Sequence, residues 1–428
     1  MGLLLLLTLL VSLAVGVPVA FSLGLTALVY MVQRPDFSML TIPQKMMTGI
    51  DSFPLLAVVF FLLAGTLMNY GGVTRRLVNL ASALVGHIIG GLAHVNIVAN
   101  VIMAGMSGSA AADAAAIGSI LIPAMTKVGF SPGFAAAVTA SAATIGPIIP
   151  PSIPFVILGS MTGVSIGRLF LGGFIPGILM GLYLMGAAYI ISKRRGYGVN
   201  TKRASFRQLV VAFWRAIPAL GMPVTVIGGI LGGVFTPTEA AAVAAVYSFL
   251  LGVIYRELKI SALGSILTEV VVSNAAVMLI VAVFSLVGWI LAIEEIPQTL
   301  SATFLFLTTN PAVFLLIVNI LLFLMGIPIE PLPIMIIMAP MLVPMLKMYN
   351  IDPVHFGVVF TLNTMIGLIT PPVGMNMYIS SYLAKCTMTD FTREAWPFII
   401  ALVLVLLLIT YVPGITLFLP NLLMGPAR

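Results

Sequence analysis

Charge is what this sequence has least of. Only 7% of its 428 residues are Asp, Glu, Lys or Arg, whereas 61% are hydrophobic. A soluble domain carries roughly 25% charged residues and cannot cover so much apolar surface. The composition therefore excludes an ordinary soluble fold and predicts an all-α polytopic membrane protein, because helices satisfy their own backbone hydrogen bonds in lipid.

Cysteine and histidine are also scarce. The single Cys386 cannot form an intrachain disulfide, and the three histidines lie too far apart along the chain to suggest a metal cluster. No phosphate-binding loop, zinc-protease motif or serine-hydrolase elbow is present. We therefore predict that the protein is not an enzyme, uses no organic cofactor and cannot hydrolyse ATP, so that an ion gradient or a separate subunit supplies its energy.

The few basic residues are concentrated in one place. Seven of the nineteen Lys and Arg residues lie between residues 193 and 215. Basic loops of membrane proteins face the cytoplasm, so membrane orientation explains the net charge of +7 better than nucleic-acid binding does.

The remaining apolar segments predict the order of the helices. Residues 2–32 lack a basic leader region and are expected to stay in the membrane, either as one long helix kinked at Pro18 or as two short segments. Residues 33–51 read as an interfacial loop or amphipathic helix. Further spans are expected at 54–70, 167–192, 216–234, 237–255 and 275–292, with interfacial helices at 73–87 and 260–274.

One stretch, from Met106 to Ile153, is apolar and yet interrupts its own helices twice. The cluster Ser107–Ser109 divides residues 91–127 into two short pieces, which favours a re-entrant hairpin. The run from Ile145 to Ser152, rich in Gly and Pro, breaks the span 131–160. Irregular backbone at this depth is tolerated only inside protein or beside a water-filled cavity, so the stretch is a candidate binding site.

The second half of the sequence repeats this pattern. The run that begins at Ile145 and holds Pro150-Pro151 matches the run that begins at Ile366 and holds Pro371-Pro372, at an offset of 221. Further matches pair Pro123 with Pro344, Pro132 with Pro353, Asn100 with Asn319, and Met106 with Met325. Counting spans from the basic loop places the two hairpins on opposite sides of the membrane, so the repeats are predicted to be inverted, an arrangement typical of secondary transporters.

The repeats divide the chain into scaffold and transport parts. We expect scaffold helices and an interfacial arm in 1–90; a first transport repeat in 91–165, with hairpin 91–127 and broken helix 131–160; scaffold helices with the basic loop 193–215 and a second arm in 166–310; a second transport repeat in 311–385, with hairpin 311–347 and broken helix 353–383; and a C-terminal helix in 386–428.

A hairpin tip that faces a broken helix offers two kinds of polar group. Amides at helix N-termini can hold a carboxylate, and free carbonyls with Ser or Thr hydroxyls can coordinate Na⁺. Small residues can instead serve close helix packing. The candidates for contacting a substrate are Ser107, Gly108, Ser109, Pro150, Pro328, Asn363 and Pro371, with Thr144 and Thr364 in support.

Two acidic residues in the apolar segments are further candidates. Asp113 and Glu330 follow the two hairpin tips, where a carboxylate either complements the dipole of the following half-helix or binds a cation. Glu239 is expected to cap a helix start, and Arg168 to extend toward the membrane surface.

Several motifs together resemble a known family. GSAAADAAAIGSILIPAM, FTPTEAAAVAAVY, GPIIPPSIPFVILG and GLITPPVGMNMYI are similar to the large membrane subunit of tripartite ATP-independent periplasmic (TRAP) transporters over essentially the whole chain. The resemblance implies a multi-pass protein of the bacterial inner membrane that imports a small carboxylate with two or more Na⁺ ions by an elevator mechanism. It also implies two partners, a small four-helix membrane subunit as a separate chain and a soluble periplasmic binding protein that delivers the substrate.

The same resemblance assigns two Na⁺ sites by position. The first would use Ser107, Ala110, Gly146, Ile149 and Pro151, and the second Gly326, Gly367, Thr370 and Val373. A self-sufficient Na⁺/dicarboxylate symporter or ion antiporter of the same architecture remains open, as does a passive channel or an assembly scaffold. A membrane-embedded enzyme is the weakest alternative. The organic acid itself is not readable from this chain.

Overall fold

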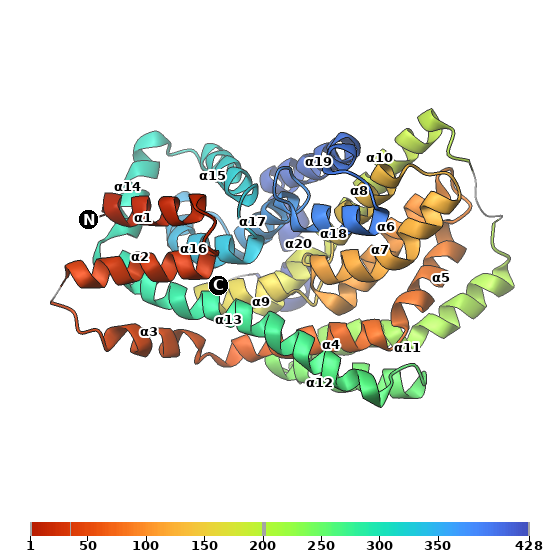
Figure 1. Ribbon diagram of the computed structural model, residues 1–428, viewed down its shortest axis with the longest axis horizontal. Helices are drawn as coiled ribbons and strands as arrows, with labels where there is room; N and C mark the ends of the chain where they lie inside the picture. Colours follow the sequence, from red (N-terminus) through yellow and green to blue (C-terminus); the bar gives the residue numbers. More distant parts are fainter. Residues whose placement is uncertain (1, 35, 199–202, 427–428) are drawn as a thin grey trace.

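The protein is helical throughout the part of the chain that is described. The computed structural model describes residues 2–34, 36–198 and 203–426, in which every regular element is an α- or 3-10 helix (Figure 1). Within these residues, seven helices are long and apolar enough to cross a membrane. The predicted class of polytopic helical membrane protein is thus confirmed.

The N-terminal quarter forms short helices before the first long span. The apolar start folds as two helices and not one, because the chain turns at Val15–Pro18. The elements are α1 (Gly2–Ala14), α2 (Val19–Gln33), α3 (Thr41–Ile50), η1 (Phe53–Leu55), α4 (Leu56–Tyr70) and α5 (Val73–Val85).

Both interrupted segments fold with their breaks where the sequence places them. The first comprises α6 (Gly91–Ser107), α7 (Ala110–Lys127), α8 (Pro132–Ala143) and α9 (Ile153–Thr162). The second comprises α15 (Pro311–Gly326), α16 (Pro331–Leu342), η3 (Val343–Tyr349), α17 (Pro353–Gly367) and α18 (Met375–Ala384). The Pro150-Pro151 and Pro371-Pro372 peptide bonds are both cis.

Local capping explains where the half-helices begin. Ser109 accepts a hydrogen bond from the backbone N–H of Ala112, and Ser152 accepts one from that of Phe155. Ser131 and Asp352 do the same for α8 and α17, each followed by a proline at the first helical position. These are the residue types that satisfy the free amides of a helix start.

Of the helices between and after the two segments, two follow the predicted spans 167–192 and 237–255 closely, and two begin earlier than the predicted spans 216–234 and 275–292. The elements are α10 (Ile166–Arg195), α11 (Phe206–Leu231), α12 (Pro237–Ile254), η2 (Ile260–Ala262), α13 (Leu263–Ile293), α14 (Ile296–Leu307), α19 (Met388–Tyr411) and α20 (Pro413–Met424).

Three sequence-based boundaries were wrong. The basic loop 193–215 is shorter than predicted, because α10 continues through Arg195 and a Ser205–Gln208 capping box starts α11 at Phe206. Residues 199–202 of this loop lie outside the described part of the chain. The interfacial segment 260–274 is not separate, since most of it belongs to the continuous 31-residue α13, which lacks internal proline. The C-terminal segment 386–428 is two helices, because the chain leaves helical geometry at Val412, before Pro413.

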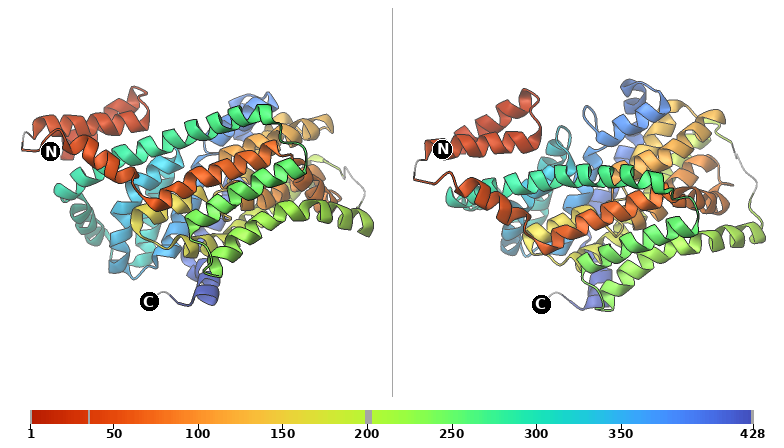
Figure 2. Two further views of the ribbon diagram at one scale, coloured as in Figure 1. Left: turned by 90° about the horizontal axis from the view of Figure 1, so that it is seen from below. Right: turned by 60° about the horizontal axis from the view of Figure 1, so that its bottom comes forward.

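The broken helices occupy the centre of the molecule. Every residue from Gly133 to Ala143 of α8 and from Val354 to Gly367 of α17 is buried. α8 packs against α7, α18 and α19, and α17 packs against α15, α10 and α19. Helices α13, α4, α12 and α11 lie side by side in one layer, which Figure 2 shows most clearly.

Candidate substrate and ion site

Both hairpin tips open into one cavity, which we call the central cavity. Its volume is about 310 Å³. The first tip contributes the residues from Gly108 to Ala111, the second tip contributes those from Glu330 to Pro333, and the two broken helices, α13 and α4 supply the remaining wall. The lining residues are Leu62, Gly108, Ser109, Ala110, Ala111, Pro147, Ile153, Pro154, Ser273, Ala276, Val277, Ile280, Glu330, Pro331, Leu332, Pro333, Met365, Leu368 and Met375.

Four helices begin at the central cavity. The first residues of α7, α9, α16 and α18 all line it: Ala110, Ile153, Pro331 and Met375. A helix N-terminus carries about half a positive charge and unpaired backbone N–H groups. Four such ends around one cavity produce a positive potential without a basic side chain, which favours an anionic ligand.

The first tip lies directly against the first broken helix. Gly108 has a φ of +61°, and a Cβ on it would lie only 2.6 Å from the carbonyl oxygen of Pro151. Only glycine accepts this conformation without strain and also permits this approach. The backbone of the tip therefore contacts the backbone of the Pro-Pro break, as the sequence pattern predicts.

The second tip makes a comparable contact. A Cβ on Gly367 would collide with the carbonyl oxygen of Gly326, and a Cβ on Gly326 would lie 3.5 Å from the Cα atom of Gly367. Both residues are buried. In each segment, therefore, the hairpin tip and its own broken helix meet through backbone atoms.

Asp113 lies behind the first tip. Its side chain is fully buried, and neither carboxylate oxygen has a hydrogen-bond partner within the described part of the chain. Gly146 of the break packs so close that a Cβ there would collide with Oδ2 of Asp113. A buried carboxylate without a partner is strongly unfavourable unless a proton or a cation neutralises it, so this position can take up either a proton or Na⁺.

Buried amides hold each hairpin on its broken helix. In the second segment, Asn363 Nδ2 donates to the backbone carbonyl and to Oδ1 of Asn319, at 2.9 and 2.8 Å. In the first, Asn96 Nδ2 of α6 donates to Thr139 Oγ1 of α8 at 2.7 Å, and Asn100 Nδ2 donates to Asn96 Oδ1 at 2.9 Å. Asn363 thus joins two elements and is absent from the cavity wall.

The hydroxyl groups of the breaks keep oxygen lone pairs available. Thr370 Oγ1 donates to the carbonyl of Ile366 at 2.8 Å, and Thr144 Oγ1 donates to that of Ser141 at 2.7 Å. Thr364 Oγ1 likewise donates to a backbone carbonyl of its own helix. A hydroxyl group that donates one hydrogen bond keeps lone pairs on its oxygen, which can accept another hydrogen bond or coordinate a cation.

The predicted site residues fall into two groups. Gly108, Ser109, Ala110 and Glu330 line the central cavity. The others do not line it. Of these, Ser107, Gly146, Ile149, Pro150, Pro151, Gly326, Asn363, Gly367 and Thr370 are buried, Pro371 is half-buried, and Pro328 and Val373 are exposed.

The two charged residues weighed as alternatives have other roles. Glu239 accepts hydrogen bonds from the backbone N–H and the hydroxyl of Thr236, which confirms the predicted cap. Arg168 donates to Gly425 and Asn421 at the C-terminal end and does not line the central cavity.

The α13 wall of the central cavity is what sequence reasoning missed. Ser273, Ala276, Val277 and Ile280 follow each other at helical spacing on one face of α13. The small residues Ser273, Ala275 and Ala276 in an otherwise bulky apolar run are the signal that could have found it, but the predicted boundary at residue 274 divided this face.

Sequence comparison decides the family. The profile described as "Tripartite ATP-independent periplasmic transporter, DctM component" matches residues 6–415. The chain belongs to this family. It is therefore the large permease subunit of a TRAP transporter, a multi-pass protein of the inner membrane.

Curated members of the family match over nearly the full chain. The sialic acid large permease protein SiaM of Vibrio cholerae is 44% identical over 411 residues, covering 96% of both chains. The C4-dicarboxylate large permease protein DctM of Rhodobacter capsulatus is 38% identical, covering 95% of this chain and 96% of that one. The isethionate permease protein DctMQ of Oleidesulfovibrio alaskensis is 41% identical and longer, so that the match covers 95% of this chain and 64% of that protein.

Two solved transporters share the fold at low sequence identity. The Alcanivorax borkumensis YdaH transporter superposes with a TM-score of 0.63 and 15% identity, covering 86% of this chain and 87% of that one. Neisseria gonorrhoeae MtrF superposes with a TM-score of 0.56 and 13% identity, covering 89% and 84%. At these identities the likeness concerns the fold alone.

Proposed function

We propose that this TRAP large permease subunit imports an organic acid together with Na⁺, after a periplasmic binding protein has delivered the acid. The observation that carries the proposal is the convergence of four helix N-termini on the central cavity. Such ends bind a carboxylate through backbone N–H groups. Relatives named for sialic acid and for C4-dicarboxylates support a carboxylate as the substrate.

Glu330 restricts how the acid lies in the cavity. It is the only ionisable side chain among the lining residues, and its carboxylate makes no capping hydrogen bond to α16. A substrate carboxylate placed beside Glu330 would be repelled. We therefore place the carboxylate near Ala110 and Ala111 at the first tip, and a hydroxyl or amine group of the substrate near Glu330.

Na⁺ coupling is supported by the buried groups behind both tips. Asp113 provides a buried carboxyl group without a partner next to Gly146, and Thr370 provides a hydroxyl oxygen next to the contact between Gly367 and Gly326. Oxygen donors of this kind suit a hard cation. Na⁺ bound at either place would bring tip and break together and so order the amides that face the substrate.

The same contacts support the proposal of an elevator mechanism. The tip and the broken helix of each repeat touch through backbone atoms, so each pair is expected to move as one body. The opposite wall of the cavity belongs to α13 and α4, which pack against α3 and α12. We propose that residues 91–165 and 311–385 form two inverted repeats that slide together along this layer.

The proposal requires two partners, a small four-helix membrane subunit and the periplasmic binding protein. The relative named DctMQ, which is longer than this chain, supports the pairing of a large with a small subunit. Neither an organic cofactor nor a covalent step is required, since transport changes no bond of the substrate.

Reconstitution tests the proposal. The chain and its small subunit are placed in proteoliposomes, the binding protein and a radiolabelled acid are added outside, and uptake is measured with an inward Na⁺ gradient or with Na⁺ replaced by K⁺. We expect uptake only with Na⁺ and the binding protein together. Uptake without the binding protein would indicate a self-sufficient symporter, and flux without Na⁺ would indicate a channel; either result would overturn the proposal.

A further inference from the structure

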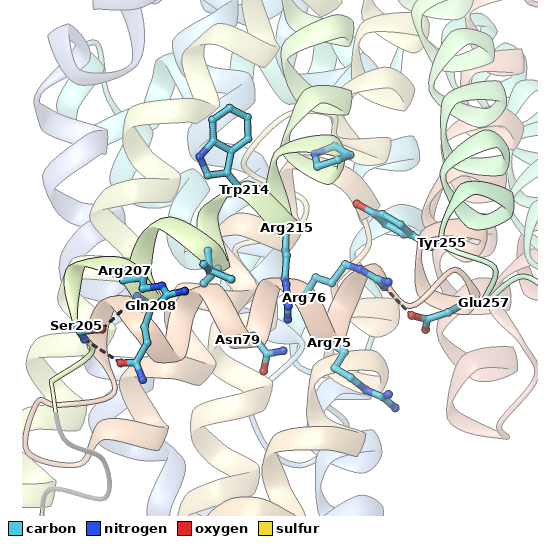
Figure 3. Close-up of a pocket in the computed structure, with 13 residues that line it drawn as sticks. Arg75, Arg76, Asn79, Ser205, Arg207, Gln208, Trp214, Arg215, Tyr255 and Glu257 are labelled. Atoms are coloured by element: carbon cyan, nitrogen blue, oxygen red, sulfur yellow. Dashed lines mark hydrogen bonds and ion pairs between the residues drawn. The ribbon is translucent and has the colours of Figure 1, made fainter.

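A second large cavity lies outside the transport machinery. It lies between α5, the first turns of α11 and the residues just after α12, and we call it the α5–α11 groove (Figure 3). Its volume is about 990 Å³, and it shares no lining residue with the central cavity. Figure 3 shows Arg215 reaching from α11 toward Arg76 and Asn79 of α5.

The α5–α11 groove has a net positive charge, because its arginines outnumber its one acidic residue, Glu257. Arg76 pairs with Glu257 at 2.8 Å, and its guanidinium lies 3.8 Å from the centre of the Tyr255 ring. Within the described part of the chain, Arg207 and Arg215 have no carboxylate within ion-pair distance. Arg75 lines the groove as well, so four arginines and one glutamate leave three positive charges. Arginine is the side chain best suited to phosphate oxygens.

Two exposed apolar side chains lie beside the arginines of the groove. Val211 and Trp214 line it and are 42% and 67% exposed, on a helix that is apolar enough to span the membrane. Exposed tryptophan beside arginine is typical of the level of the lipid headgroups. A ligand with a phosphate head and acyl chains would satisfy both the arginines and this apolar surface, whereas a free anion would use only the arginines.

The side of the membrane indicates which lipids are available. The α11 side of the groove, from Ser205 to Arg215, belongs to the basic segment 193–215, which by the excess of Lys and Arg faces the cytoplasm. Anionic phospholipids are enriched in that leaflet, and basic pockets between membrane helices bind their headgroups.

We propose that the α5–α11 groove binds the phosphate headgroup of an anionic phospholipid from the cytoplasmic leaflet. Arg207 and Arg215 contact the phosphate, Arg76 is positioned beside them by Glu257, and the acyl chains lie along Val211 and Trp214. The lipid then joins α5 to α11. This site stands independently of the proposed transport function.

Thermal unfolding in nanodiscs tests the site. The purified chain is placed in discs of phosphatidylcholine with and without phosphatidylglycerol, and the rise in Tm caused by phosphatidylglycerol is measured for wild type, Arg215→Gln and Arg393→Gln. Arg393 is an exposed arginine on α19 and serves as the matched control. We expect Arg215→Gln to lower the affinity for phosphatidylglycerol about fivefold, the contribution of one arginine near a membrane surface, and therefore to reduce the rise in Tm. Arg393→Gln should leave the rise unchanged.

Two further measurements separate other occupants. Inorganic phosphate is added to phosphatidylcholine discs, and the small subunit is added to discs that contain phosphatidylglycerol. We expect no rise in Tm with phosphate and an undiminished lipid effect with the small subunit. Three results would each overturn the proposal. They are equal responses of the two variants to phosphatidylglycerol, a rise in Tm with phosphate alone, and loss of the lipid effect when the small subunit binds. Because every variant is compared with itself in two lipids, a general loss of stability does not imitate the expected result.

Discussion

Gly146 leaves room for the carboxylate of Asp113, because any Cβ at this position would collide with Oδ2. The glycine of the first break and the acid of α7, the half-helix that follows the first tip, therefore form one unit. The sequence separates them by 33 positions, and the hairpin brings them together behind the Gly108 contact.

Replacing Asp113 with Asn removes the buried charge and preserves its volume. We expect about tenfold weaker Na⁺ dependence of uptake, equivalent to about 1.4 kcal/mol. We also expect a higher Tm in Na⁺-free buffer, since the unfavourable buried charge is gone. Uptake measured against Na⁺ concentration tests the first expectation, and thermal unfolding in Na⁺-free buffer tests the second. Asp36→Asn, at a side chain that is 80% exposed, is the control; a wild-type Na⁺ response of Asp113→Asn would contradict Na⁺ binding at Asp113.

A methyl group on Gly108 should separate the first tip from its break. Gly108→Ala places a Cβ at φ +61° and 2.6 Å from the carbonyl oxygen of Pro151. Strain of this kind costs about 1–3 kcal/mol, so we expect reduced stability and reduced uptake. Gly186→Ala in α10 is the matched control, because no atom lies within 4 Å of its added Cβ. Equal uptake by the two variants would show that the tight contact is dispensable.

The hydroxyl of Thr370 should matter more than its methyl group. Thr370→Ala removes a buried oxygen that donates to Ile366 and keeps lone pairs for a cation. We expect Thr370→Ala to require more Na⁺ for half-maximal uptake, whereas Thr370→Ser should behave like wild type. If Ala and Ser variants respond alike, the second Na⁺ site lies elsewhere.

Two adjacent alanines of α13 distinguish the cavity wall from other exposed surface. Ala276 lines the central cavity and Ala275 does not, although both are exposed. We expect Ala276→Phe to fill the cavity and abolish uptake while the Na⁺-induced rise in Tm persists. Ala275→Phe should transport normally. Uptake by Ala276→Phe at the wild-type rate would exclude this cavity as the substrate site.

Cys386 provides a pH-dependent probe between α18 and α19. Burial raises the pKa of the Cys386 thiol, and the nearby Asp390 carboxylate raises it further. The thiolate is the reactive form, and a raised pKa leaves less thiolate at neutral pH than an ordinary cysteine has. Alkylation should therefore accelerate as the pH rises, with a midpoint above the ordinary pKa of a thiol. The rate of iodoacetamide labelling measures this midpoint. In detergent-denatured protein the midpoint should fall to the ordinary value, and a native midpoint at or below it would contradict the prediction.

The sequence predicted the broken segments and several long helices well, whereas it misplaced the starts of α11 and α13. Ser109, Ser152 and the Pro-Pro pairs are local signals, because caps and prolines act on their own neighbours. The position of α13 is different: its boundary and its cavity face depend on packing against α3 and α4, which no local pattern records. For the same reason, the sequence could propose Asp113 but could not show that Gly146 lies against it.

The use of backbone N–H groups at the central cavity has an evolutionary consequence. Those amides are present with any residue except proline, which already occupies three positions, Pro154, Pro331 and Pro333, so most exchanges at the helix starts leave the affinity for a carboxylate largely intact. Side chains on α13, such as Ser273 and Ala276, can change without disturbing them. Gene duplicates of this protein could therefore acquire different acids through a few exchanges on one helix, with the ion-coupled parts unaltered.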